Sequence, residues 1–153
     1  MRIIFLGNGE RGLRCLWSLV AERYEIQAVI IHHTTQSARI SNPIGDFANR
    51  HSIPVLMPEN INSPESLDAI SAFNPDLIVM SGYTQILKKP VLERPTIGVI
   101  NLHGGRLPEY RGGSPINWQI INGESEGGVA VHFVDEGIDT GAILASETFP
   151  IGE

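Results

Sequence analysis

The sequence predicts an α/β fold: a mostly parallel, twisted sheet with helices on both faces and an antiparallel hairpin at one edge. The first observation is that short apolar runs alternate with helix-like stretches over residues 1–123, a pattern typical of strands joined by crossover helices. The second is that two strand-like segments, residues 129–134 and 142–146, follow each other across a glycine-containing connection. This close succession favours an antiparallel pair.

Five further apolar runs are expected to form the other strands of the sheet. They cover residues 3–6, 26–31, 54–56, 77–80 and 99–100. The run at 77–80 contains no polar residue, which indicates a strand buried on both faces, as in a parallel sheet.

Helices are expected between these strands, where apolar residues recur at helical spacing or a capping residue precedes them. The stretches that carry these signals are residues 13–20, 44–48, 63–66, 86–92 and 114–123. Ser63 is a suitable N-cap, because Pro64 follows it at the first helical position. Gly123 is expected to end the last helix.

Size and composition indicate a single globular domain over residues 1–153, and we expect further C-terminal sequence because the chain ends just after a strand-like segment. The net charge of −6 and the scattered basic residues argue against nucleic-acid binding. No apolar run approaches the ~20 residues that cross a bilayer, so no membrane contact is expected. The single cysteine, Cys15, excludes an internal disulfide and suits a cytoplasmic location.

A glycine motif follows the first expected strand: Gly7, Asn8 and Gly9 begin a G-x-G-x-x-G pattern that leads into a helix. A turn that contacts a phosphate or substrate and a turn without any ligand are both open. Binding of NAD is disfavoured, since the second strand ends at His32 and His33 with no acidic residue for a ribose. Adjacent histidines point in opposite directions on an extended segment, so we expect a solvated loop there rather than a metal site.

Asn101 and His103 lie at the carboxyl end of the run at 99–100, where ligands bind in parallel α/β sheets. Two residues apart on an extended segment, their side chains point to the same side. Two arginines follow, Arg106 and Arg111, and both are suited to bind phosphate. The alternative is a polar pair that merely closes a strand, with solvated arginines and with Asp139 in an ordinary acidic turn.

The order of the motifs distinguishes these alternatives. Residues 101–112, 115–118, 122–124 and 137–141 together resemble the formyltransferase family, which uses 10-formyltetrahydrofolate as its formyl donor and has a Rossmann-like sheet. The resemblance extends over most of the chain. It implies that Asn101, His103 and Asp139 are catalytic residues, and that residues 1–153 are a formyltransferase catalytic domain truncated at its C-terminus.

The resemblance also implies which residues bind the folate, whereas the expected substrate contacts rest on the glycine motif and on the two arginines. Two segments match the family's pterin loops and are expected to bind the donor: Gly82, Tyr83, Thr84, Gln85, Ile86 and Leu87 in the first, and Val134, Glu136 and Ile138 in the second. The residues expected to contact substrate are Gly7, Asn8, Gly9, Arg106 and Arg111. No metal is implied.

The acceptor is suggested by a departure from the family pattern. Many members carry Ser-Leu-Leu-Pro where this chain has Gly-Arg-Leu-Pro at residues 105–108, which looks closest to enzymes that formylate nucleotide-linked amino sugars, such as dTDP- or UDP-4-amino sugars. The alternatives are the catalytic domain of a methionyl-tRNA formyltransferase, a formyltetrahydrofolate hydrolase, and a folate- or nucleotide-binding fragment without turnover. A homodimer is expected only through C-terminal elements that this chain lacks.

Overall fold

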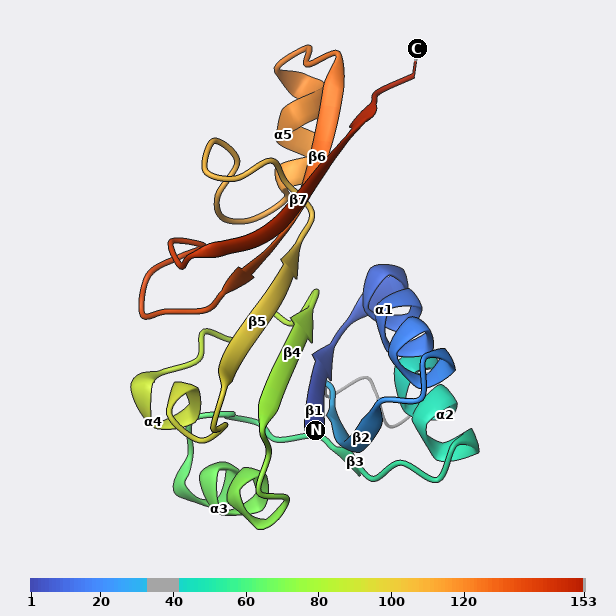
Figure 1. Ribbon diagram of the computed structural model, residues 1–153, viewed down its shortest axis with the longest axis vertical. Coiled ribbons are helices and arrows are strands. Elements are labelled where there is room, and N and C mark those ends of the chain that lie inside the picture. Colours follow the sequence, from blue (N-terminus) through green and yellow to red (C-terminus); the bar gives the residue numbers. More distant parts are fainter. Residues whose placement is uncertain (33–41, 153) are drawn as a thin grey trace. The chain divides into compact units, whose positions relative to one another are not determined.

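The computed structural model describes residues 1–32 and 42–152. It divides into two compact units, Met1–Val99 and Ile100–Glu153, which we call the N-terminal and the C-terminal unit (Figure 1). The strand order of the seven-stranded sheet is β3-β2-β1-β4-β5-β6-β7. The predicted fold class, a mostly parallel sheet with an antiparallel edge pair, is therefore confirmed.

The N-terminal unit is built on four parallel strands. These are β1 (Arg2–Gly7), β2 (Glu25–Ile30), β3 (Val55–Leu56) and β4 (Leu77–Ser81). Strand β1 pairs with β2 on one side and with β4 on the other, and β2 pairs with β3. All five residues of β4 are buried, as its uniformly apolar sequence predicts.

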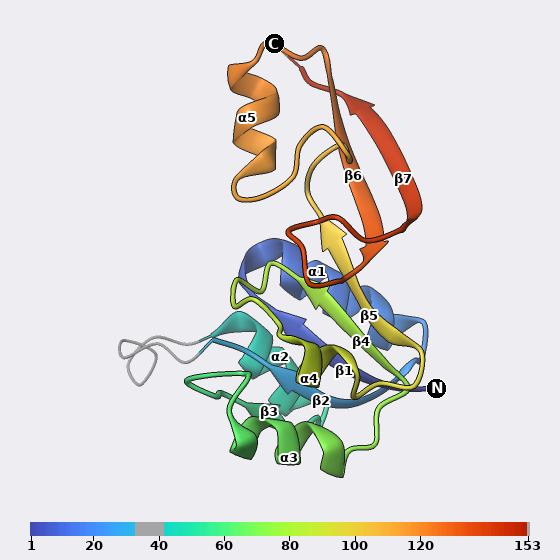
Figure 2. The same cartoon turned by 90° about the vertical axis from the view of Figure 1, so that its left-hand side faces the viewer.

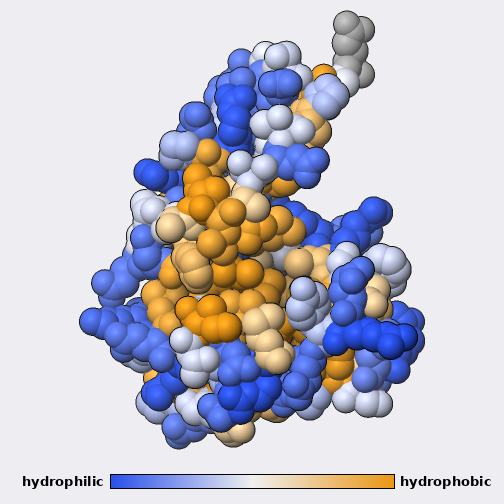
Figure 3. All heavy atoms as spheres, in the orientation of Figure 1, coloured by the Kyte–Doolittle hydropathy of each residue, from blue (hydrophilic) through white to orange (hydrophobic). Residues whose placement is uncertain are grey.

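Helices cover both faces of these strands. They are α1 (Gly9–Ala21), α2 (Pro43–Arg50), α3 (Pro64–Ala72) and the short α4 (Lys89–Leu92). Figures 1 and 2 show α1 and α2 on one face and α3 and α4 on the other. In the space-filling view, hydrophobic residues gather over β4, and hydrophilic residues cover α2 and α3 (Figure 3). The Ser63 Oγ accepts a hydrogen bond from Ser66 N (3.2 Å), so the predicted N-cap of α3 is confirmed.

Strand β5 (Gly98–His103) enters the C-terminal unit at Ile100. The unit also contains β6 (Glu126–Phe133) and β7 (Ile143–Pro150), which continue the sheet in antiparallel pairs, and helix α5 (Pro115–Ile121), which lies between β5 and β6 in the chain. Strand β6 pairs with β5 and with β7 (Figure 2). Gly123 follows α5 with φ +69°, in the left-handed region, and so ends the helix as predicted.

Two of the differences from the predicted extents concern predicted site residues. Helix α4 begins only at Lys89, so Ile86 and Leu87 belong to the preceding loop and not to the expected helix. Pro90 favours a helix start at this point, because its ring fits the first helical turn. Strand β5 runs on to His103, so Asn101 and His103 are strand residues whose directions are fixed by the sheet. In the described part of the chain, no helix is long and apolar enough to span a membrane.

Candidate active site

Four polar groups of the C-terminal unit converge on the carboxylate of Asp139. The Oδ2 atom accepts a hydrogen bond from Gly112 N (2.9 Å) and lies 3.4 Å from His103 Nδ1. The Oδ1 atom lies 3.2 Å from His132 Nε2 and 3.5 Å from Asn101 Nδ2. The structure thus brings together all three predicted catalytic residues, Asn101, His103 and Asp139, and adds His132 to them.

The register of the β5–β6 pair explains this convergence. Asn101 lies directly opposite His132, and their side-chain nitrogens Nδ2 and Nε2 are 3.3 Å apart. His103 is two residues further along β5, opposite Ala130. Because side chains alternate along a strand, Asn101 and His103 leave the same face, as the sequence predicts.

His103 is 5% exposed, and both of its ring nitrogens face oxygen atoms. Nε2 lies 2.6 Å from the carbonyl oxygen of Tyr110, which can only accept, so Nε2 carries the hydrogen of this bond. The chain must come close here: a Cβ on Gly105 would lie 2.8 Å from that carbonyl oxygen and 3.0 Å from His103 Nε2. Glycine at position 105 therefore allows the carbonyl group to reach the imidazole.

His132 was not identified from the sequence. Its side chain is 1% exposed, and Nδ1 donates to the carbonyl oxygen of Phe133 (2.7 Å) while Nε2 faces the Asp139 carboxylate. Two acceptors around one ring favour its doubly protonated form. The hydrogen bond to Asp139 raises the pKa of His132, against the effect of burial. A histidine within an apolar strand resembles a core residue, and only its pairing opposite Asn101 distinguishes it.

Asp139 is held in an unusual backbone conformation, with φ +51°. The left-handed region is tolerated by aspartate better than by most residues, and Arg111 Nε donates to the Asp139 carbonyl oxygen (3.1 Å). Burial raises the pKa of the Asp139 carboxyl, but hydrogen bonds from His132 and Gly112 and the charges of both histidines outweigh it, so the pKa is lowered. The carboxylate therefore stays ionised at neutral pH.

The two arginines predicted to bind anions both have partners within the C-terminal unit. Arg111 holds the backbone of Asp139, as described above. Arg106 Nη2 lies 3.2 Å from Glu124 Oε2, and its guanidinium carbon is 5.7 Å from the centre of the Tyr110 ring. The Tyr110 hydroxyl donates to Glu124 and, with Arg106, lowers the pKa of that carboxyl. Their role in binding substrate phosphate stays a prediction.

Gln119 connects α5 to the strands and to the loop after β5. Its side chain is 2% exposed. Oε1 accepts from Gly128 N (2.9 Å) and Arg106 N (3.4 Å), and Nε2 donates to the carbonyl oxygens of Gly104 (3.4 Å) and Pro115 (3.2 Å). One buried amide thereby fixes the backbone that precedes Arg106 and Tyr110.

In the N-terminal unit, the motif of Gly7, Asn8 and Gly9 joins β1 to α1. Asn8 N donates to Ser81 O (3.1 Å), and a Cβ on Gly82 would lie 2.5 Å from Asn8 O. The motif therefore packs its backbone against the end of β4. Its predicted contact with substrate stays a prediction.

The loop from Gly82 to Leu87, the first predicted folate segment, combines buried and exposed side chains. Tyr83 is 7% exposed, and within the described residues its hydroxyl has no hydrogen-bond partner; Ile86 is 67% exposed. A buried unpaired hydroxyl and an open apolar side chain are consistent with a loop that receives an aromatic ligand. The side chain of Gln85, however, is engaged within the protein: Oε1 accepts from Ile61 N (2.9 Å) and Nε2 donates to Glu59 O (3.2 Å). These bonds stabilise the conformation of the loop.

The second predicted folate segment, residues 134–138, is a tight turn in the C-terminal unit. Asp135 Oδ1 accepts from Gly137 N (3.0 Å) and from the Thr140 hydroxyl (2.6 Å), and these bonds lower the pKa of Asp135 against the effect of burial. Ile138 is 62% exposed. In the described residues, no group of three or more His, Cys, Asp or Glu side chains is arranged to hold a metal ion.

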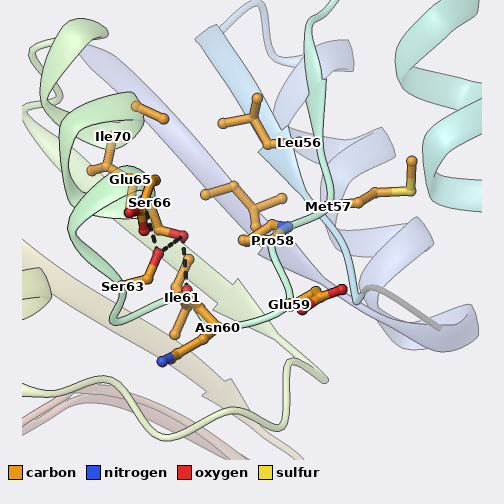
Figure 4. A pocket seen from close by; sticks show the side chains of 12 residues that line it. Leu56, Met57, Pro58, Glu59, Asn60, Ile61, Ser63, Glu65, Ser66 and Ile70 are labelled. Carbon is orange, nitrogen blue, oxygen red and sulfur yellow. Dashed lines mark hydrogen bonds between the residues drawn. The ribbon is translucent and has the colours of Figure 1, made fainter. Parts of the chain in front are cut away.

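A cavity of about 480 Å³ lies in the N-terminal unit beside the start of α3. Ile61 and Ile70, both fully buried, belong to its lining, and the Ser66 hydroxyl binds Asn60 O (2.7 Å) at its edge (Figure 4). Gln85 of the first predicted folate segment hydrogen-bonds the backbone of Glu59 and Ile61, which both line the cavity, so the cavity lies next to the residues that hold this segment.

Comparisons with known proteins agree with the motifs. A family model described as Formyl transferase matches residues 1–153. The methionyl-tRNA formyltransferase of Methylacidiphilum infernorum is 46% identical over 152 residues, which cover 96% of this chain and 48% of that protein. The enzyme of the same name from Citrifermentans bemidjiense is 41% identical over 156 residues, covering 99% and 49%. The chain thus spans about half the length of these relatives.

Solved structures share the fold. The phosphoribosylglycinamide formyltransferase of Bacillus halodurans superposes with a TM-score of 0.84 at 24% identity, over 100% of this chain and 81% of that one. WlaRD, a sugar 3N-formyl transferase crystallised in the presence of dTDP and 5-N-formyl-THF, gives a TM-score of 0.73 at 25% identity, over 99% and 52%.

Proposed function

Because the chain belongs to the formyl transferase family, we propose that it is the catalytic part of an enzyme that transfers a formyl group from 10-formyltetrahydrofolate to a primary amine. The observation that carries the proposal is the convergence of Asn101, His103 and His132 on the ionised carboxylate of Asp139. An amide donor, an imidazole and a carboxylate suffice for acyl transfer to an amine.

Two segments are assigned to the formyl donor from their motifs, each considered by itself. They are the loop residues Gly82 to Leu87 and the turn residues Val134, Glu136 and Ile138. The Tyr83 hydroxyl, which has no hydrogen-bond partner among residues 1–32 and 42–152, and the exposed Ile86 and Ile138 side chains support this assignment. When bound, the donor supplies an electrophilic carbonyl carbon.

The side chains around Asp139 would divide the chemistry among them. The Asn101 amide has two hydrogens; one is directed at Asp139 Oδ1 and the other would stabilise the oxyanion that develops when the amine attacks. The His103 imidazole would balance the charge of the Asp139 carboxylate. The proton of the attacking amine would pass, through a water held by that carboxylate, to the departing folate nitrogen as the bond between this nitrogen and the formyl carbon breaks. Removal of one oxyanion donor typically lowers kcat by about 100- to 1000-fold.

For the acceptor, we infer the amine of methionyl-tRNA. Relatives with that name are 39–46% identical to this chain, whereas the sugar enzyme is 25% identical. The basic residue that suggested a nucleotide-linked sugar, Arg106, is paired with Glu124 and is therefore a weaker indication of phosphate binding. This inference replaces the expectation of an amino-sugar acceptor and of no nucleic-acid partner.

The test is formylation of a panel of acceptors. The chain is incubated with 10-formyltetrahydrofolate and either methionyl-tRNA or dTDP-linked amino sugars, and products are identified by mass spectrometry. We expect formylmethionine, with turnover lowered about 100- to 1000-fold by Asn101→Ala and unchanged by Asn49→Ala on the exposed surface of α2. A formylated sugar in place of formylmethionine overturns the acceptor, and donor hydrolysis without any formylated amine overturns the transfer itself.

A further inference from the structure

His32, at the end of β2, is attached to the first folate segment. Its imidazole stacks on the Tyr83 ring, with centroids 4.3 Å apart and planes 6° from parallel. Thr84 N donates to His32 Nε2 (3.0 Å), and the Thr84 hydroxyl lies 3.1 Å from the same nitrogen. His32 therefore has hydrogen-bonding and stacking partners, while His33 and the rest of the predicted solvated loop lie outside the described residues.

The far end of the same loop is fixed by a separate set of bonds. Gln85 binds the backbone of residues 59 and 61, as described above. In the reverse direction, Asn62 Nδ2 donates to Ile86 O (2.9 Å) and Asn62 Oδ1 accepts from Lys88 N (2.8 Å). With Gln85 to Lys88 held in this way, His32 contacts the two loop residues that come before them, Tyr83 and Thr84.

The bond from Thr84 requires one particular form of His32. A backbone N–H can only donate, so Nε2 must present its lone pair, and the ring hydrogen must be on Nδ1. If Nε2 were protonated, its N–H would face the N–H of Thr84, and the hydrogen bond between them would be lost. Burial lowers the pKa of His32 and so favours the neutral ring. Among the described residues, the titratable side chain that stacks on His32 is Tyr83, which stays neutral because burial raises its pKa to about 12.

We propose that His32 is a positioning residue for the formyl donor: its neutral imidazole holds Tyr83 and Thr84 in the conformation that receives the folate, and its protonation releases them. The proposal rests on the proposed function, since it assigns a role within the same donor site. It goes beyond that function by adding a residue remote in sequence from the loop and a dependence of donor binding on pH.

The test compares two variants that separate the hydrogen bond from the ring stacking. His32→Phe keeps an aromatic ring against Tyr83 but offers no acceptor to Thr84, whereas His32→Gln keeps an acceptor that does not titrate. His51→Gln is the matched control. His51, at the end of α2, also packs on an aromatic ring: the centroids of the His51 and Phe47 rings are 4.4 Å apart. Binding of 5-formyltetrahydrofolate, a non-transferring analogue of the donor, is measured by calorimetry.

We expect His32→Phe to weaken binding of this analogue about tenfold at about pH 8, because it leaves a backbone N–H unpaired. His32→Gln and His51→Gln should bind within about twofold of the original chain. In turnover, His32→Phe should raise the KM for the donor and leave kcat nearly unchanged. Acidification to about pH 5 should weaken binding by the original chain more than by His32→Gln. Without any ligand, the Thr84 amide should exchange with deuterium faster in His32→Phe.

The outcomes separate this proposal from the proposed function. If the original chain binds the analogue and His32→Phe binds it equally well, with unchanged exchange at Thr84, the positioning role is overturned. If His32→Gln shows the same acid dependence as the original chain, the role of protonation is overturned. If the original chain does not bind the folate at all, the proposed function itself fails, and the positioning role fails with it.

Discussion

A single carboxylate organises the candidate site at the scale of residues. Asp139 accepts from Gly112 N and faces two imidazoles and an amide, and its left-handed backbone aims the carboxylate into this group. Asn101, His103 and Asp139 were predicted through the family resemblance of the motifs that contain them. His132 was not, since its neighbours Val131 and Phe133 make it resemble a residue of an ordinary core strand.

The His132–Asp139 pair should make stability depend on pH in both directions. Folding raises the pKa of His132. The stabilisation that protonated His132 gives the fold is therefore complete below its unfolded pKa of about 6.5, and it is lost as pH rises through the pKa of the folded chain. The pKa of Asp139 is lowered, so its contribution is present above about 4 and is lost as pH falls. The pair should therefore stabilise the fold most between about pH 4 and pH 6.5.

Urea denaturation of the original chain and of His132→Gln measures this effect. The difference between their free energies of unfolding should be largest in that window and should decrease on either side. His51→Gln, which alters a histidine outside the site, provides the control. A difference that stays constant from about pH 4 to about pH 9 would mean that no ionised pair forms between His132 and Asp139.

At the scale of elements, apolar runs predicted the strands well, because burial in a parallel sheet leaves a clear hydrophobic signal in β1, β2 and β4. The helix α4 was predicted too long. The apolar Ile86 and Leu87 resembled a helical face, but tertiary hydrogen bonds from Asn62 and Gln85 hold that segment as a loop. Contacts of this kind, between residues more than twenty positions apart, have no local signature in the sequence.

Helix α5 offers a test of how one side chain positions an element. Gln119→Leu keeps a similar volume but leaves Gly128 N and the other backbone partners of the amide unpaired in a buried site. We expect a loss of about 1–3 kcal/mol in the free energy of unfolding, measured by thermal and urea denaturation. Gln27→Leu is the control, because the Gln27 side chain bonds Glu25 at an exposed position. Equal effects of the two substitutions would show that the buried network adds little.

At the scale of the whole molecule, each of the two compact units contains predicted site residues. The N-terminal unit carries the glycine motif and the loop tied by His32, and the C-terminal unit carries the Asp139 group. The resemblance identified the family because its motifs recur in a fixed order along the chain. It could not identify the acceptor from Arg106, since a basic residue in a sequence does not reveal that its charge is paired, here with Glu124.

Acid stability of the molecule should depend on a pair that joins the start of β1 to the residue before β4. Asp76 accepts from Arg2 N (2.7 Å) and Arg2 Nη2 (2.9 Å), and Asp76 N donates to Arg2 O (2.9 Å). The hydrogen bonds from Arg2 lower the pKa of Asp76 to about 2. A carboxyl whose pKa is lowered by folding stabilises the chain above its unfolded value of about 4, and this contribution is lost as pH falls toward 2.

Replacing Asp76 by Asn should therefore reduce the free energy of unfolding at neutral pH and flatten its decline between about pH 4 and about pH 2. Asp68→Asn on the exposed surface of α3 is the matched control, and urea denaturation across this range supplies the measurement. If the Asp76→Asn chain loses stability on acidification as steeply as the original, the acid dependence must come from other carboxylates whose pKa is lowered by folding, such as Glu124, Asp135 and Asp139.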